Sequence, residues 1–305
     1  MQLSELATAE IVERIRGPGL AIRTGPFCFR VVSRFESVAR AVQEMYAEYP
    51  LAADGDFADF TVELQPGAGI RRWFRRQVRF RWEGMYPFEP LPAEQAYPLL
   101  EWALNWCIAG YGHQFLMLHA AVIERAGKAL IMPAPPGSGK STLCAALIHR
   151  GWRLLSDELA LISPEDRLIS PLGRPVSLKN RSLEVIRQFV PGVVLTAATR
   201  DTAKGTVAHM RVPTDQVRAL GVRAPAAWVV FPRYQAGMPA TLVPRSKADS
   251  MFELGRNAFN YTLMGLTGFE VLADVVSACD CYDFSYGDLD EAVDVFARLA
   301  DGASA

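Results

Sequence analysis

Ala134 to Thr142 reads APPGSGKST and matches the pattern G-x-x-x-x-G-K-[ST] in all but its first glycine, where Ala134 stands. In this pattern backbone N–H groups surround a β-phosphate, the lysine reaches the β- and γ-phosphate oxygens, and the hydroxyl binds Mg²⁺. The first position begins the loop and does not approach the phosphate most closely, so alanine fits there if its φ is negative. The stretch therefore predicts a loop that binds the phosphates of a nucleotide.

The residues on either side supply the strand and the helix that such a loop needs. Ala129 to Ile131 is an apolar run typical of a buried strand, and Leu143 and Leu147 are four residues apart, as on one face of a helix. The pattern places Mg²⁺ on the Ser141 hydroxyl. The predicted phosphate-binding residues are Pro136, Gly137, Ser138, Gly139, Lys140, Ser141 and Thr142.

Two kinds of pattern divide the chain near residue 110. The first hundred residues alternate short strand-like runs with one amphipathic helix, Ser37 to Tyr49, which predicts a small α+β domain over residues 1–110. Residues 111–305 carry strand, loop, helix (141–150) and two more strands (152–156 and 159–162), which predicts an α/β nucleotide-binding domain. The strand-like runs of the first part are Leu20 to Arg23, Cys28 to Val32, Phe60 to Leu64 and Val78 to Trp82.

The longest apolar stretch, Leu99 to Ile123, is interrupted by polar side chains that would be costly in lipid. We expect no membrane span there. The stretch is better divided into a helix over residues 99–107, ended by Gly110, and a buried strand over residues 115–124.

Two adjacent acids, Asp157 and Glu158, follow the predicted strand at residues 152–156. Phosphoryl-transfer enzymes place metal-binding and base carboxylates about one helix and one strand after the loop. Because side chains alternate along a strand, one acid can face the metal and the other can face elsewhere. An exposed acidic turn is the structural alternative.

His119, in the apolar strand before the loop, is by itself more typical of a hydrogen-bonded core histidine.

Further cations are expected around a transferring phosphate, since the reaction is mainly one of charge positioning. Arg174, Lys179, Lys204 and Arg211 are candidates, because each lies in a short segment flanked by turns. A solvated surface charge is the alternative for each, and for Arg174 and Arg211 it is the more typical one. Between Ile70 and Trp82, IRRWFRRQVRFRW places six arginines beside aromatic residues. The alternation of Val78, Phe80 and Trp82 with Arg79 and Arg81 predicts an amphipathic strand with its basic face outward. A solvated face is the more typical reading, and docking of an acidic protein or peptide and binding of nucleic acid are the alternatives.

Composition limits the other possibilities. Lys plus Arg (32) nearly balances Asp plus Glu (33), so a net charge of −1 offers no global attraction to nucleic acid or to an anionic membrane. We therefore expect neither as a partner, and either one would have to use a local patch. The five cysteines are odd in number and scattered, and the N-terminus lacks a basic start followed by an apolar run, so we expect a cytoplasmic chain with reduced thiols. Cys279 and Cys281 form a single C-x-C, to which we assign no metal or redox role.

With these residues assembled, Leu118 to Ile162 resembles HPr kinase/phosphorylase, and most closely the group of HPr-kinase-related kinases A. The resemblance extends over nearly the whole chain. Further stretches that carry it are PFEPLP (87–92), LLEWALNW (99–106), RPVSLKN (174–180), KGTVAHMR (204–211), FNY (259–261) and YGDLDEA (286–292).

This resemblance implies a PEP-carboxykinase-like fold, in which a mixed, strongly bent sheet carries the phosphate loop, and transfer of the ATP γ-phosphoryl group to a hydroxyl. It also implies Asp157 as general base, Glu158 as a Mg²⁺ ligand and His119 as an active-site residue. HPr kinases assemble as hexamers, so a homo-oligomer is expected. Their downstream glycine-rich signature is not found, and Arg174 to Asn180 stands roughly in its place. This departure leaves open whether HPr is the acceptor and whether a reverse phosphorylase activity exists.

The sequence thus predicts a Mg-ATP-dependent kinase acting on a Ser or Thr hydroxyl of a protein or peptide. Two alternatives remain open: a small-molecule kinase with the same site, and a nucleotide-gated binding protein with little turnover.

Overall fold

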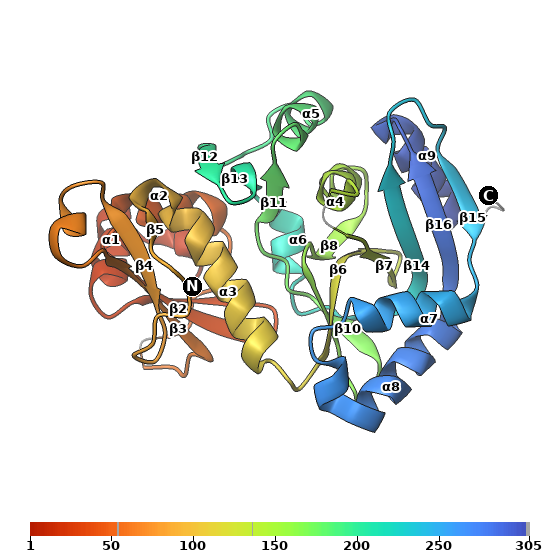
Figure 1. The fold of residues 1–305 in the computed structure, drawn as a ribbon, viewed down its shortest axis with the longest axis horizontal. Helices are drawn as coiled ribbons and strands as arrows, with labels where there is room; N and C mark the ends of the chain where they lie inside the picture. Colours follow the sequence, from red (N-terminus) through yellow and green to blue (C-terminus); the bar gives the residue numbers. More distant parts are fainter. Residues whose placement is uncertain (54, 136, 303–305) are drawn as a thin grey trace.

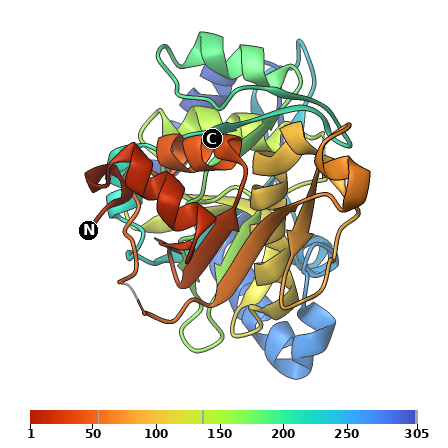
Figure 2. The same cartoon turned by 90° about the vertical axis from the view of Figure 1, so that its left-hand side faces the viewer.

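The structure is a computed structural model that describes residues 1–53, 55–135 and 137–302. Figure 1 shows an N-terminal unit, coloured red to yellow, beside a larger unit built from the remainder of the chain. In Figure 2 the N-terminal unit stands in front of the larger one. No helix of the described ranges has both the length and the apolar composition needed to cross a membrane.

The N-terminal unit is a five-stranded sheet, in the order β1-β2-β3-β4-β5, packed against helices. Only β2 and β3 pair in parallel. Its strands are β1 (Leu20–Thr24), β2 (Phe27–Ser33), β3 (Phe60–Pro66), β4 (Gln77–Arg81) and β5 (Leu91–Pro92). Its helices are α1 (Thr8–Arg16), α2 (Glu36–Met45) and α3 (Ala96–Tyr111), with 3-10 turns η1 (Leu3–Glu5), η2 (Gly69–Arg72) and η3 (Ala93–Gln95).

The larger unit contains a mixed sheet of eight strands, in the order β10-β9-β6-β7-β14-β16-β15, with β8 also paired to β6. β14 pairs in parallel with β7 and with β16, and the other pairings are antiparallel. The strands are β6 (Leu116–Arg125), β7 (Lys128–Pro133), β8 (Arg153–Ser156), β9 (Leu159–Ile162), β10 (Leu168–Ser170), β14 (Ala224–Tyr234), β15 (Thr241–Pro244) and β16 (Asp280–Tyr286).

A separate three-stranded sheet, β11-β13-β12, lies between the two units in Figure 1. It consists of β11 (Val176–Lys179), β12 (Thr199–Thr202) and β13 (Gly205–Met210). The helices of the larger unit are α4 (Lys140–Ile148), α5 (Ser182–Phe189), α6 (Thr214–Arg218), α7 (Lys247–Arg256), α8 (Tyr261–Ala278) and α9 (Leu289–Ala300).

The central strands are apolar on both sides because helices cover both faces of the sheet. Along β7, Leu130 and Met132 pack into the core that holds α4 and α9, whereas Ala129 and Ile131 pack into the core that holds α8. Strands covered on both faces read as continuous hydrophobic runs and not as alternating ones. This double cover holds β7 rigidly where it delivers the glycine-rich loop.

Two predicted elements have different bounds in the structure. α3 begins three residues before Leu99 and continues through Gly110, because Pro98 falls in the first turn, where its missing N–H is tolerated. The strand predicted over residues 78–82 corresponds to β4, which begins one residue earlier, at Gln77, and ends at Arg81. β3 ends at Pro66, opposite Val78, and residues 69–72 form the 3-10 turn η2.

Candidate functional site

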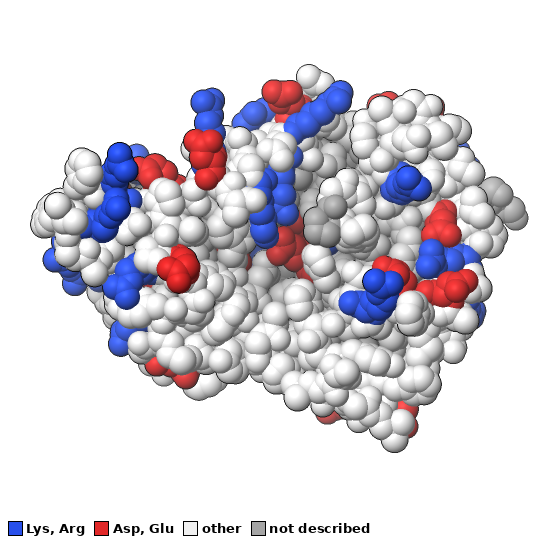
Figure 3. Space-filling model, in the orientation of Figure 1, with Lys and Arg blue, Asp and Glu red and all other residues white. Residues whose placement is uncertain are grey.

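A cavity of about 1430 Å³ lies between α3 of the N-terminal unit and the larger unit. Figure 3 shows the hollow at the centre of the molecule, bordered by Lys and Arg side chains with acidic side chains at its base. Its walls include the described part of the glycine-rich loop, the start of α4, helix α5, and the turn from β16 into α9. Residues far apart in the sequence therefore meet around one space.

The loop has the backbone geometry that its glycines permit. Gly137 and Gly139 both have φ of +89°, a left-handed conformation that costs other residues energy, and α4 begins directly after Gly139. The Ser138 carbonyl accepts from the backbone N–H of Tyr234 at 3.0 Å, and the Gly139 carbonyl accepts from the Tyr286 hydroxyl at 3.2 Å. These bonds fix the N-terminus of α4 at the cavity wall. Pro136 lies outside the described residues.

Lys140 is buried, with 8% of its surface exposed, although it lines the cavity. Its ammonium group donates to the backbone carbonyl of Asp157 at 3.2 Å. The loop lysine is therefore bonded to the backbone at the start of the acidic pair. Ser141 and Thr142 also line the cavity, and the Thr142 hydroxyl is 2.6 Å from that of Ser182 on α5.

Asp157 is 6% exposed and lies behind the loop. One carboxylate oxygen, Oδ2, accepts from the backbone N–H of Ser177 at 3.2 Å, whereas Oδ1 is buried without a hydrogen-bond partner among the described residues. Burial raises the pKa of this carboxyl above its usual range, opposed chiefly by the Lys140 charge. The unpaired oxygen is free to accept a proton, a hydrogen bond or a cation.

Glu158 lines the large cavity, and its pKa is shifted in the opposite direction from that of Asp157. Burial alone would raise its pKa, but the charges of Lys204, Lys179, Lys140 and Arg174 together hold the pKa below its usual range. The carboxylate is thus ionised at neutral pH. Its Oε2 accepts from the side-chain amide of Asn105 on α3.

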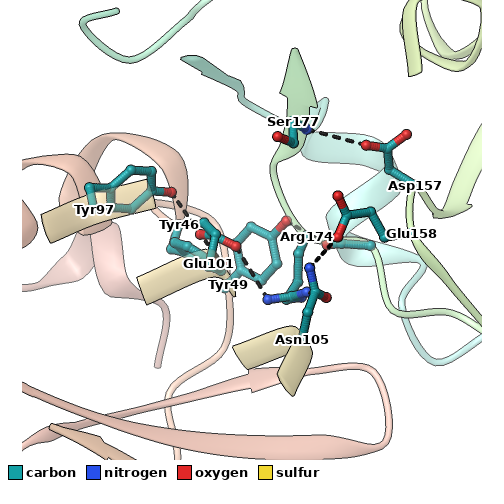
Figure 4. A network of polar contacts seen from close by, with 10 residues as sticks. Tyr46, Tyr49, Tyr97, Glu101, Asn105, Asp157, Glu158, Arg174 and Ser177 are labelled. Atoms are coloured by element: carbon teal, nitrogen blue, oxygen red, sulfur yellow. Dashed lines mark hydrogen bonds and ion pairs between the residues drawn. The ribbon is translucent and has the colours of Figure 1, made fainter. Parts of the chain in front are cut away.

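Asn105 belongs to a polar network that joins the two units (Figure 4). Its amide oxygen accepts from Arg174, and the Arg174 guanidinium also pairs with the Glu101 carboxylate at 3.3 Å. Glu101 in turn accepts from the hydroxyls of Tyr46 at 2.8 Å and Tyr97 at 2.9 Å. The network thereby connects the core of the N-terminal unit to Glu158.

The structure does not bring every predicted cation into the large cavity. Lys179 and Lys204 line it, and the Lys204 ammonium lies 5.3 Å from the centre of the Trp102 ring. Arg174 lines a smaller neighbouring cavity of about 20 Å³ that Asp157 and Glu158 share, and it is 7% exposed. The Arg174 guanidinium is bonded to Glu101 and Asn105, and Asn105 donates to Glu158. Arg174 can therefore position Glu158 through Asn105 without lining the large cavity.

His119 lies on β6 and lines the cavity. Its backbone N–H donates to the Asn257 carbonyl at 2.7 Å, and its ring lies 5.9 Å from that of Phe259. Burial, followed by the Lys140 charge, lowers the pKa of His119 to about 4. The imidazole is therefore neutral near pH 7 and can accept a hydrogen bond within the cavity.

Sequence reasoning missed Asn105, Tyr234 and Tyr286. Asn105 is four residues after Glu101 in an apolar helix, so the two polar side chains share one face, a signal that was available. The tyrosines lie about a hundred residues or more beyond the loop in the sequence, and no local pattern connects them to it.

No protein-family model matches the chain, and no curated protein matches it. Among solved structures, it is similar to the HPr(Ser) kinase/phosphatase from Coxiella burnetii, with 14% sequence identity and a TM-score of 0.29. The similarity covers 61% of this chain and 99% of that one. Because the identity and the TM-score are this low, function has to be inferred from the geometry of the site.

Proposed function

We propose that this chain is a Mg-ATP-dependent phosphotransferase of the HPr kinase type, with a PEP-carboxykinase-like domain that transfers the γ-phosphoryl group to a Ser or Thr hydroxyl of a protein or peptide. One observation carries the proposal. The loop with two left-handed glycines opens α4 in the wall of a cavity, and its lysine donates to the backbone carbonyl of Asp157, the first residue of the acidic pair. A phosphate bound at a helix N-terminus would there lie beside two carboxyl groups of different pKa.

Mg²⁺ fits the residues present. The described residues contain no cluster of three or more His, Cys, Asp and Glu side chains, so the ion would rest on the Ser141 hydroxyl, Glu158 and the phosphate oxygens. Glu158 is ionised, as a ligand must be, and Asp157 Oδ1 is a buried oxygen with no partner among the described residues. Bound there, the ion would neutralise charge on the β- and γ-phosphates.

The acceptor hydroxyl needs a base, and Asp157 has the properties of one. Its pKa is raised toward the working range of a general base, and its free Oδ1 can accept the proton. A second assignment exchanges the two acids, with Glu158 as base and Asp157 beside Ser141 on the metal. It is favoured by position, since Glu158 lines the large cavity and Asp157 lies behind it.

The size of the cavity supports a reaction with a second substrate. Small-molecule sites usually occupy about 300–1,000 Å³. At about 1430 Å³ the cavity exceeds that range, which leaves room for an acceptor segment beside a nucleotide. Lys179 and Lys204, on the wall near Glu158, would then stabilise the transferring phosphate. Cytoplasmic location and a homo-oligomer belong to the same proposal.

The test is transfer of label from γ-labelled ATP, first to proteins of a cell extract and then to peptides from the labelled protein. Incorporation that is lost in Asp157→Asn or in Lys140→Met supports the kinase. Label confined to small molecules would identify a small-molecule kinase. ATP binding without incorporation into either class would identify a nucleotide-gated binding protein.

A further inference from the structure

The segment between β3 and β4 forms an exposed tip, residues 68–76, that the proposed function does not use. Every residue of this β3–β4 tip is exposed, and none of them lines either cavity described above. Three large apolar side chains project from it, with 72% of Ile70, 80% of Trp73 and 61% of Phe74 exposed. Isolated exposed apolar residues are common, but three within five residues on a projecting turn call for an explanation.

The same tip carries a concentrated positive charge. Arg71, Arg72, Arg75 and Arg76 alternate with the apolar residues, and none of these four makes an ion pair with any described residue. The Arg75 guanidinium lies 5.7 Å from the centre of the Phe74 ring. The neighbouring arginines of β4 are engaged, since Arg81 pairs with Glu63 at 2.9 Å and Arg79 lies 3.5 Å from the centre of the Tyr86 ring. Within the arginine-rich stretch of residues 70–82, the arginines without an ion pair to a described residue or a contact with the Tyr86 ring therefore lie in the tip.

The backbone presents these side chains outward. Residues 69–72 form the 3-10 turn η2, and Arg75 has a left-handed φ of +46°, which reverses the chain before β4. Gly67 is tied to Gln77 by a backbone bond of 2.8 Å, so the base of the tip is closed. The tip is a short convex projection on a folded base.

We propose that the β3–β4 tip docks the protein on an anionic lipid surface. Its apolar side chains would enter the interface, while the four arginines would lie among negatively charged headgroups. A single lipid chain holds a protein only weakly at a membrane, and a basic patch is one second signal that makes the attachment stable. By analogy, the tip combines apolar side chains with a basic patch within nine residues. This is a contact with the membrane surface and not a span.

The shape of the tip favours a membrane over a macromolecular partner. A stable protein interface takes about 20–30 residues on each side, which is far more than the tip offers. Proteins that bind single-stranded nucleic acid combine stacking aromatic residues with a basic groove that follows the backbone. Here the arginines surround a convex turn, which suits a flat, deformable surface.

The test uses the full chain and vesicles of phosphatidylcholine alone or mixed with phosphatidylglycerol. We expect sedimentation with the anionic vesicles only, weakening as salt is raised. Since each arginine near an anionic surface contributes about 1 kcal/mol, Arg72→Ala and Arg75→Ala should each weaken partitioning by about fivefold. Arg16→Ala and Arg34→Ala, at exposed positions elsewhere in the N-terminal unit, remove the same charge and should leave partitioning unchanged.

Insertion of the apolar side chains is tested separately by fluorescence. Trp73 is the one largely exposed tryptophan of the described residues, so its emission should shift to shorter wavelength on anionic vesicles and be quenched by brominated lipid. Trp73→Phe should lose both signals. Phe252→Ala, at a residue of α7 that is 68% exposed, is the control and should bind as the parent does.

Several outcomes would overturn the proposal. Equal binding to neutral vesicles, equal loss in the Arg16 and Arg34 controls, or an unchanged Trp73 signal would each exclude docking through the tip. Tight binding to single-stranded DNA that depends on Trp73 and Arg72, with no vesicle binding, would identify the tip as a nucleic-acid contact. ATP hydrolysis of the tip variants, measured in parallel, reports on the phosphotransferase proposal independently.

Discussion

The Arg174 guanidinium and the Glu101 carboxylate form a buried ion pair, 3.3 Å apart, between the larger unit and the N-terminal unit. Glu101 is 4% exposed and Arg174 is 7% exposed. Burial raises the pKa of Glu101, and the Arg174 charge is the leading influence that opposes this shift. Each partner thus offsets much of the other's cost of leaving water.

Removing one partner of this pair should be much more damaging than removing both. We expect Arg174→Met to lower the free energy of unfolding by about 3–5 kcal/mol, because Glu101 is left buried without its counter-charge. Adding Glu101→Gln should recover part of that loss. The measurement is denaturant unfolding of the single and double variants.

The pair between Arg211 and Glu48 is a matched control. It also joins the two units, at 3.4 Å, but its side chains are 29% and 20% exposed. We expect Arg211→Met to cost at most about 1 kcal/mol. Equal losses in Arg174→Met and Arg211→Met would show that burial of the Glu101 pair has no special effect.

Asp157→Asn and Glu158→Gln should differ in phenotype under the proposed function. Loss of a general base should reduce kcat by about 10²- to 10⁴-fold with ATP affinity nearly kept, which we expect of Asp157→Asn. Glu158→Gln should raise the Mg²⁺ concentration needed for half-maximal rate. The reverse pattern would assign the base to Glu158, and identical effects on both parameters would exclude any division of roles.

Lys140→Met should abolish ATP binding and turnover. The change keeps most of the buried apolar stem but removes the charge that a nucleotide β- and γ-phosphate would contact. Because Lys140 is buried and bonded to the Asp157 carbonyl, stability should also fall modestly, by about 1 kcal/mol for one hydrogen bond. Calorimetric titration with ATP, beside a thermal melt, separates the two effects, and unchanged ATP affinity would refute the nucleotide site.

His209 should make folding sensitive to acid. It is 1% exposed with both ring nitrogens unpaired among the described residues, and burial lowers its pKa from 6.5 to about 3. Between these values the unfolded chain binds a proton that the folded chain does not. The contribution of His209 to the pH dependence is therefore absent above pH 6.5. Below pH 6.5 the free energy of unfolding falls as the pH decreases, by up to about 1.4 kcal/mol per pH unit. His209→Leu should flatten this slope between pH 6 and 5 in denaturant titrations, and an unchanged slope would contradict the assignment.

The sequence predicted helices and strands correctly where the local pattern of residues is typical of one type of secondary structure. The apolar runs that predicted strands at residues 115–124 and 128–132 correspond to β6 and β7. A short, continuous apolar run is typical of a strand that is buried on both faces. The helix predicted over residues 141–150 corresponds to α4, which begins one residue earlier. Bounds were less well predicted for α3, where Gly110 did not end the helix.

The pairing of strands that lie far apart in the sequence could not be predicted from local patterns. β14 lies between β7 and β16 in the large sheet, yet Pro232 within it would argue against a central strand. The proline is tolerated because β7 pairs with β14 only as far as Val229, and Pro232 lies beyond that register. The acids, the loop and His119 were identified as candidates from the sequence, whereas the contribution of α3 to the cavity depends on how the two units pack.

The two loop glycines should respond differently to alanine. Both have φ of +89°, so Gly137→Ala and Gly139→Ala each carry the strain of a left-handed residue, about 1–2 kcal/mol. At Gly137 an added Cβ meets nothing within 4 Å, but at Gly139 it would lie 2.5 Å from the Tyr286 hydroxyl and 2.9 Å from Cβ of Tyr234. We expect Gly137→Ala to lose only the strain energy. Gly139→Ala should lose more stability and most of its ATP binding, since the start of α4 must move.

A double variant separates strain from collision at Gly139. Tyr286→Phe removes the nearest atom, so adding it to Gly139→Ala should recover part of the lost stability, although the contact with Tyr234 remains. Alone, Tyr286→Phe should cost about 1 kcal/mol, because it removes the bond to the Gly139 carbonyl. Thermal melts and ATP titrations of the four variants form the experiment. If Gly137→Ala and Gly139→Ala are equally destabilised, or if Tyr286→Phe gives no recovery, the close approach of Tyr286 does not constrain the loop.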